Sequence, residues 1–276
     1  MNELTKRIIV AAIGIPVGII VMYLGGIIFN VVILIISLIA LIEFYKIAEK
    51  KGYPTCIPIG IIIVGFPIIA VLSHKIYSVT DYKPFIDITA PHFILLFITL
   101  FFVMPLYFLF SKKENFLAGI GVAFTSFFYI SLPFFSLVLL RDLENGFYYT
   151  ILTFASIWVC DSAAFFIGRK FGKHKLAPNI SPKKSVEGAI AGFIASTTFF
   201  VITSNYLIEI SLVLSIVLGV VIGIFGQIGD LIESKIKRDA GVKDSGNIIP
   251  GHGGVLDRFD SIIFVVPFVY IILLLL

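Results

Sequence analysis

The stretch between residues 235 and 260 combines glycines, bases and acids in a pattern that suits a phosphate-bearing substrate. Its five glycines and Pro250 prevent a continuous helix, and glycine lets backbone N–H groups approach an anion closely. Its fixed positive charges include Lys237, Arg238, Lys243 and Arg258. The hard oxygen ligands that Mg²⁺ prefers would come from Asp230, Asp244, Asp257 and Asp260. This mixture favours a metal–phosphate substrate over free phosphate, and the alternative is a solvated charged loop.

A polar seam precedes this stretch. Helical periodicity puts four polar side chains on one face, namely Gln227, Asp230, Ser234 and Arg238. A carboxylate at a membrane boundary costs on the order of a few kcal/mol unless it is paired or bound to a cation. Asp230 is therefore either a functional carboxylate or the partner of Lys237 or Arg238 at the end of a helix.

Two further acids lie within apolar runs. Asp161 is well inside one such run and should face the interior of a helix bundle, with a lysine, a cation or a hydroxyl as its partner. Glu43 lies nearer the end of its run, and we interpret it first as a structural polar anchor.

A second basic loop covers residues 168–186. Ser181 followed by Pro182 is a typical cap and first residue of a helix, and a helix start beside Lys183 and Lys184 would suit a phosphate. Lys170, Lys173 and Lys175 have an alternative role, which is attraction to lipid headgroups.

These loops must be held by membrane helices, because 59% of the 276 residues are hydrophobic, 14% are charged and the mean hydropathy is +1.07. This composition excludes a soluble enzyme and a disordered chain, and the long apolar runs disfavour a β-barrel. We expect an all-α integral membrane protein with nine spans. Their approximate bounds are 8–29, 31–48, 57–73, 92–110, 117–140, 147–167, 187–207, 211–232 and 260–276. The third span contains Pro58 and Pro67, which predict a kinked or partly re-entrant segment.

The distribution of basic residues predicts the orientation of the chain. With nine spans, 18 of the 21 Lys and Arg residues fall on one side and 3 on the other. The positive-inside rule then places the N-terminus in the cytoplasm and the C-terminus outside. We expect residues 1–276 to form a single membrane domain, with N-terminal spans in 1–145 and the catalytic spans and loops in 147–276. Cys56 and Cys160 indicate buried hydrophobic residues.

The glycine-containing stretch resembles a known signature. Over 27 residues the pattern is Ser234-x-Ile236-Lys237-Arg238-x4-Lys243-Asp244-x-Gly246-x2-Ile249-Pro250-Gly251-His252-Gly253-Gly254-Val255-x-Asp257-Arg258-Phe259-Asp260. It is similar to the signature of the phosphatidate cytidylyltransferases, also called CDP-diacylglycerol synthases. The segments Asp161-Ser162 and 181–188 are similar to the same family, and Glu43-Phe44-Tyr45 is similar more weakly.

The resemblance implies that CTP and phosphatidate react to give CDP-diacylglycerol and pyrophosphate, with Mg²⁺ and possibly a second metal ion. It also implies a dimer in the inner membrane, with its active site facing the cytoplasm and no nucleic-acid partner. The residues expected to be catalytic are Asp230, Asp257, Lys237, Arg238, Lys243, Asp244, His252 and Arg258. Those expected to bind substrate are Lys183, Lys184, Ser181, Ser234, Gly253, Gly254 and Asp161, and those expected to bind metal are Asp230, Asp257 and Asp260.

The four lysines and arginines of the first set would bind phosphates, and His252 would either donate to a phosphate oxygen or orient the loop. Three alternatives remain open. The first is a CTP-dependent polyprenol or phytol kinase. The second is an ion-coupled transporter in which Asp161 and Asp230 bind the ion. The third is a non-catalytic scaffold.

Overall fold

The computed structural model describes residues 3–80, 90–111 and 114–275 of the chain. The chain divides into two compact units. The first consists of Met1–Val138 and Ala240–Leu256, and the second of Leu139–Asp239 and Asp257–Leu276. Each unit is described by itself below.

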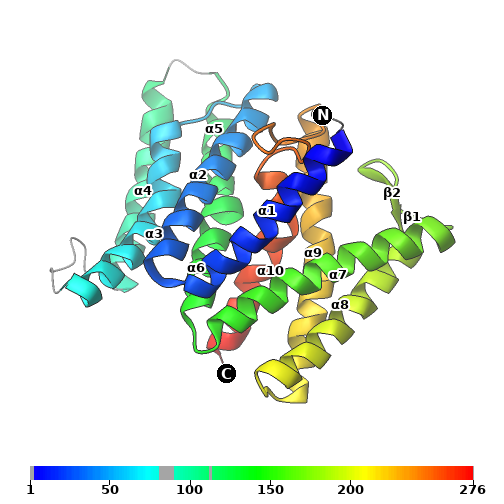
Figure 1. Cartoon of the computed structure of the whole chain (residues 1–276). Coiled ribbons are helices and arrows are strands. Elements are labelled where there is room, and N and C mark those ends of the chain that lie inside the picture. The colour runs from blue at the N-terminus through cyan, green and yellow to red at the C-terminus, as the bar shows by residue number, and fades with distance from the viewer. Residues whose placement is uncertain (1–2, 81–89, 112–113, 276) are drawn as a thin grey trace. The chain divides into compact units, whose positions relative to one another are not determined.

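The first unit is built from helices (Figure 1). They are α1 (Glu3–Leu24), α2 (Gly26–Lys50), α3 (Ile57–Thr80), α4 (Ala90–Phe110), α5 (Phe116–Ser126), the π-helix η1 (Phe127–Ser131) and the first part of α6 (Leu132–Asp142). Helix α2 packs against α3, and both contact η1. Buried hydroxyls join these helices, since Ser131 Oγ donates to the carbonyl of Ile63 over 2.7 Å. The apolar runs thus form a bundle in which α2 buries one part of its surface.

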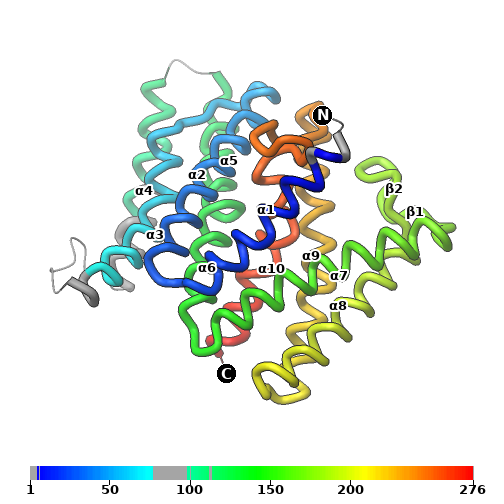
Figure 2. Tube along the Cα trace, in the orientation of Figure 1, coloured from blue at the N-terminus to red at the C-terminus, as the bar shows by residue number. Residues whose placement is uncertain are grey.

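The second unit contains α7 (Gly146–Phe171), α8 (Val186–Leu207), α9 (Leu212–Asp239) and α10 (Leu256–Leu274). A small hairpin, β1 (Lys175–Ala177) and β2 (Ser181–Ser185), connects α7 to α8. Its strands pair antiparallel, with Lys175 opposite Ser185. The tube in Figure 2 follows α7, the hairpin and α8 as consecutive green to yellow segments.

Glycines let the helices of the second unit approach closely. A Cβ atom on Gly188 of α8 would lie 2.7 Å from the carbonyl oxygen of Ala164 in α7, and one on Gly192 would lie 2.8 Å from that of Cys160. A Cβ atom on Gly229 of α9 would lie 2.7 Å from the carbonyl oxygen of Asp260 in α10. Small residues at such crossings are typical of helices that pack inside a bilayer.

Seven helices are long and apolar enough to cross a membrane, judged by length and composition over the described residues. They are Arg7–Leu24, Gly26–Lys50, Ile57–Ile76, Phe116–Asp142, Gly146–Phe171, Val186–Leu207 and Leu212–Asp239. A multi-pass helical membrane protein is therefore confirmed. Helices α4 and α10 coincide with the predicted spans 92–110 and 260–276 but are not among the seven, so the count of nine stays a prediction.

Helix α3 is 24 residues long and continues through Pro67, so it is longer than the expected span 57–73, and the predicted kink stays a prediction. One local prediction was wrong. The expected helix start at Ser181 and Pro182 is instead strand β2, and α8 begins at Val186 with Ser185 as its N-cap. The hydroxyl of Ser185 accepts the N–H of Gly188 over 3.2 Å. Because Ser185 also precedes an acidic first turn containing Glu187, it satisfies the capping rule better than Ser181 does.

Candidate active site

A cleft of about 790 Å³ opens in the second unit between α7, the hairpin, α8 and α9. Four basic side chains line it, namely Arg169, Lys175, Lys183 and Lys184, together with the acids Asp161 and Asp230. Its volume is in the range of small-molecule sites. The cleft therefore brings the basic hairpin together with Asp161, which lies within an apolar run, and with Asp230 of the polar seam. Ser181 is in β2 and is not among the residues that line the cleft.

Asp230 of α9 forms an ion pair with Lys184 of strand β2 in the hairpin. Both side chains are partly exposed, 26% for Asp230 and 30% for Lys184, so a ligand can reach them. Ser234 Oγ donates to Asp230 Oδ1 over 3.3 Å, and Gln227 Nε2 donates to the carbonyl of Ala189 over 3.1 Å. Gln227 and Asp230 of the polar seam thus line the cleft, where Asp230 lies next to a lysine that can bind phosphate.

Lys237 and Asp257 form a second ion pair, which is buried within this unit. Lys237 Nζ lies 2.5 Å from Asp257 Oδ1 and 3.1 Å from Glu233 Oε1. The side chains of Glu233, Asp257 and Lys237 are 0%, 6% and 10% exposed. Neither carboxylate oxygen of Glu233 accepts a hydrogen bond of good geometry from the described residues. Sequence reasoning missed Glu233, although its i, i+4 spacing to Lys237 in an apolar helix was a usable signal.

The acids of this unit suit a hard divalent cation in part. Asp161 and Asp230 both line the cleft, together with Lys184. Among the described residues, no group of three or more His, Cys, Asp or Glu side chains is arranged to hold a metal ion by itself. Mg²⁺ usually takes only one or two carboxylates and completes its shell with water and substrate phosphates. The donors present are therefore compatible with Mg²⁺ that arrives with a nucleotide.

The hairpin beside the cleft is tied to the start of α8 by Glu187. Its carboxylate accepts the N–H of Lys173 over 3.1 Å and that of His174 over 3.2 Å. His174 Nδ1 lies 2.7 Å from the same carboxylate. These contacts hold the backbone that leads into Lys175, which lines the cleft.

The signature loop between α9 and α10 belongs to the first unit, where it folds into a tight turn. Pro250 and Gly251 are its central residues, Gly251 has φ +75°, and the N–H of His252 donates to the carbonyl of Ile249 over 2.9 Å. Pro followed by a residue of positive φ is the pattern of a type II turn. Gly253 has φ +82°, and its carbonyl accepts the N–H of Ile249 over 3.0 Å. Glycine is thus needed at 251 and 253 for backbone shape.

The other predicted residues of the loop differ in exposure. Lys243 and Asp244 are exposed, His252 and Gly253 are half-buried, and Gly254 is buried. Arg7 of α1 donates from Nε to the carbonyl of Gly251 over 2.8 Å. Arg238 at the end of α9 and Arg258 in the first turn of α10 are exposed in the second unit.

Glu43 is the anchor of this loop. Its carboxylate, on a residue that is 1% exposed, accepts hydrogen bonds from Ser245 Oγ and from the N–H groups of Val255 and Leu256. The interpretation of Glu43 as a structural anchor named no partner. The only available signal was an acid inside an apolar run, because its partners are more than 200 residues away in the sequence.

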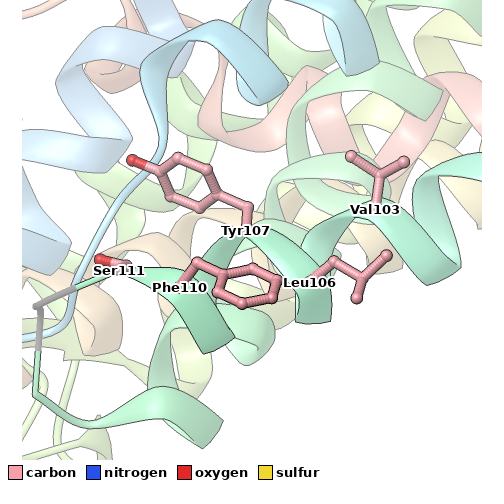
Figure 3. Close-up of a pocket in the computed structure, with 5 residues that line it drawn as sticks. All are labelled: Val103, Leu106, Tyr107, Phe110 and Ser111. Atoms are coloured by element: carbon pink, nitrogen blue, oxygen red, sulfur yellow. The ribbon is translucent and has the colours of Figure 1, made fainter.

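A second depression, of about 440 Å³, lies on α4 and is lined by Val103, Leu106, Tyr107, Phe110 and Ser111 (Figure 3). None of these five side chains carries a charge, and the four large ones are exposed. Such a surface suits lipid chains rather than phosphate chemistry.

The family model described as the cytidylyltransferase family matches residues 5–276. A phosphatidate cytidylyltransferase of Staphylococcus aureus (strain COL) is 33% identical over 277 residues, which cover 97% of this chain and 98% of that protein. The chain belongs to the cytidylyltransferase family. The family predicted from residues 234–260 is thereby confirmed.

Two other relatives match over shorter stretches. The phosphatidate cytidylyltransferase of Bacillus subtilis (strain 168) is 44% identical over 155 residues, so the aligned part spans about half of that protein, 55%. The enzyme of the same name from Staphylococcus saprophyticus is 39% identical over 178 residues, which cover 64% of this chain and 68% of that protein. Phosphatidate cytidylyltransferases similar to this chain therefore occur in several bacteria.

Proposed function

We propose that this chain transfers the cytidylyl group of CTP to phosphatidate and releases pyrophosphate. Family membership and the names of the relatives support this reaction. The observation that assigns this reaction to particular residues is the cleft in which Lys184 pairs with Asp230 beside three further basic side chains. A membrane enzyme that joins a nucleotide to a lipid phosphate needs such a cationic cleft, because both of its substrates are anions.

The reaction needs no nucleophile from the protein. A phosphate oxygen of phosphatidate attacks the α-phosphorus of CTP, a new P–O–P bond forms, and the bond to the β-phosphate breaks to release pyrophosphate. The work of the chain is to hold two anions together and to stabilise the charge on the leaving pyrophosphate. Arg169, Lys175, Lys183 and Lys184 provide that charge in the cleft. Asp230 keeps Lys184 oriented while no phosphate is bound.

We propose Mg²⁺ as the cofactor. Asp230 and Asp257 would hold it, with Asp260 and Asp161 as weaker ligands, and it would neutralise the charge of the triphosphate. The loop residues Lys243, Asp244, His252, Gly253 and Gly254 keep the roles that the signature implies for them. Ser181 is not among the residues that line the cleft. Its role in substrate binding therefore rests on the family resemblance alone.

We also propose the finer membrane arrangement. Nine spans, a cytoplasmic N-terminus and an external C-terminus follow from the 18 to 3 partition of basic residues. This topology puts residues 168–186 and 235–258 on the cytoplasmic side, where CTP is available. A homodimer in the inner membrane is part of the same proposal.

CTP labelled in turn on its α- and γ-phosphorus tests the reaction. Purified protein in detergent is incubated with Mg²⁺ and phosphatidate, and the lipid fraction is separated from pyrophosphate. We expect the α-label in the lipid and the γ-label in pyrophosphate. The γ-label in a lipid, above all in an isoprenoid phosphate, would instead identify a CTP-dependent kinase. Absence of turnover despite CTP binding would overturn the proposal.

A further inference from the structure

Glu43 makes three hydrogen bonds to the signature loop, and two of the three donors are backbone groups. Oε1 accepts the N–H of Val255 over 3.0 Å, while Oε2 accepts that of Leu256 over 2.8 Å and Ser245 Oγ over 3.1 Å. All of these residues belong to the first unit. The N–H of Leu256 therefore has a partner at the end of the loop.

The burial of Glu43 explains why the loop needs such an anchor. Glu43 is 1% exposed, and Val255 and Leu256 are buried as well. Buried backbone N–H groups are costly unless they find partners inside the protein. The carboxylate supplies those partners, and the loop N–H groups in turn satisfy a buried charge.

The loop is also shaped around this side chain. A Cβ atom on Gly246 would lie 2.6 Å from Glu43 Oε1, and its three nearest atoms all belong to Glu43. A Cβ atom on Gly254 would lie 2.5 Å from Oε2. Gly246 is not among the glycines with positive φ, so closeness to Glu43, rather than backbone conformation, is what requires glycine there.

We propose that Glu43 is a positioning residue for cytidylyl transfer. It fixes the backbone of residues 245–256, and with it the signature loop that carries His252, Gly253 and Gly254. This inference rests on the proposed function for its kinetic test. Glu43 itself touches the loop and no substrate; it acts by setting where the loop groups stand.

The kinetic test uses Glu43→Gln. Both oxygens of Glu43 accept backbone N–H groups, so the amide of Gln must turn its own N–H₂ toward one of them and leave that donor unpaired. We expect kcat to fall by about 100-fold, the loss that a displacement of about 1 Å can cause, while KM for CTP changes less than threefold. Glu49→Gln is the matched control, because Glu49 is on the same helix and accepts a hydrogen bond from Thr55; it should retain wild-type kcat.

A double-variant cycle tests the contact itself. Gly246→Ala should lower kcat because its methyl group meets Glu43, whereas Glu43→Asp withdraws the carboxylate. In the double variant the loss should be at least about threefold smaller than the product of the two single losses. Losses that simply multiply would show that the two sites act independently and would overturn the proposal.

Hydrogen exchange tests the role of Glu43 independently of the reaction. Peptides covering residues 245–256 should exchange faster in Glu43→Gln than in the wild type, while peptides from α5 should not change. If the wild type does not turn over phosphatidate, the proposed function fails and exchange still decides the role of Glu43. Unchanged exchange in the loop, or wild-type kcat in an active Glu43→Gln enzyme, refutes the positioning role.

Discussion

Replacement of Lys237 by Met should destabilise the protein severely. Lys237 forms ion pairs with Glu233 at 3.1 Å and with Asp257 at 2.5 Å, and both acids are at least nine-tenths buried. Without the lysine, two carboxylates remain next to each other in a low dielectric. Removal of one member of a buried ion pair costs about 3–5 kcal/mol, which lowers the folding equilibrium constant by more than 100-fold.

The assay is unfolding of the detergent-solubilised protein by a denaturing detergent, followed by circular dichroism. Lys235→Met is the matched control, because Lys235 is on the same helix and exposed, and it should change the free energy of unfolding by less than about 0.5 kcal/mol. Adding Glu233→Gln to Lys237→Met should recover part of the lost stability, since one buried charge is removed. Wild-type stability of Lys237→Met, combined with loss of CTP affinity, would refute this reasoning and identify Lys237 as a phosphate ligand.

Two further predictions concern the walls of the cleft. Gly188→Ala should destabilise the protein by about 1–3 kcal/mol, because its methyl group would lie 2.7 Å from the carbonyl oxygen of Ala164. Thermal unfolding measures this, and Gly121→Ala, where a methyl group meets nothing within 4 Å, should be neutral. Equal unfolding temperatures of the two variants would contradict the packing argument. Glu187→Gln should raise KM for CTP a few-fold with little change in kcat, because it weakens the contacts to His174 that hold the hairpin; steady-state kinetics measure this, and an unchanged KM would show that the hairpin needs no such tether.

Much of the helical architecture could be predicted from the sequence because its signals are local. Apolar runs of about 20 residues mark membrane helices, and the polar face of α9 follows from helical periodicity. The same periodicity places Ser234 beside Asp230, four residues earlier, as the structure has it. The signature between residues 234 and 260 gave the family, which the match over residues 5–276 confirms.

The partners of the buried acids could not be predicted, because they are distant in sequence. Lys184 is 46 residues from Asp230, and Val255 is 212 residues from Glu43. Periodicity says which face of a helix is polar, but not which loop returns to meet it. The hairpin was missed for a related reason: Ser181 and Pro182 have the composition of a helix start, and strand pairing with residues 175–177 overrode that preference.

The most direct test of the central claim is cytidylyl transfer by Asp230→Asn, measured at saturating Mg²⁺ with Asp239→Asn as the control at the end of the same helix. The account predicts that Asp230→Asn abolishes transfer while the protein still inserts and keeps its helical content, because the carboxylate that orients Lys184 and is proposed to hold Mg²⁺ is gone. Asp257→Asn should behave in the same way. Full activity of either variant would contradict the assignment of this site.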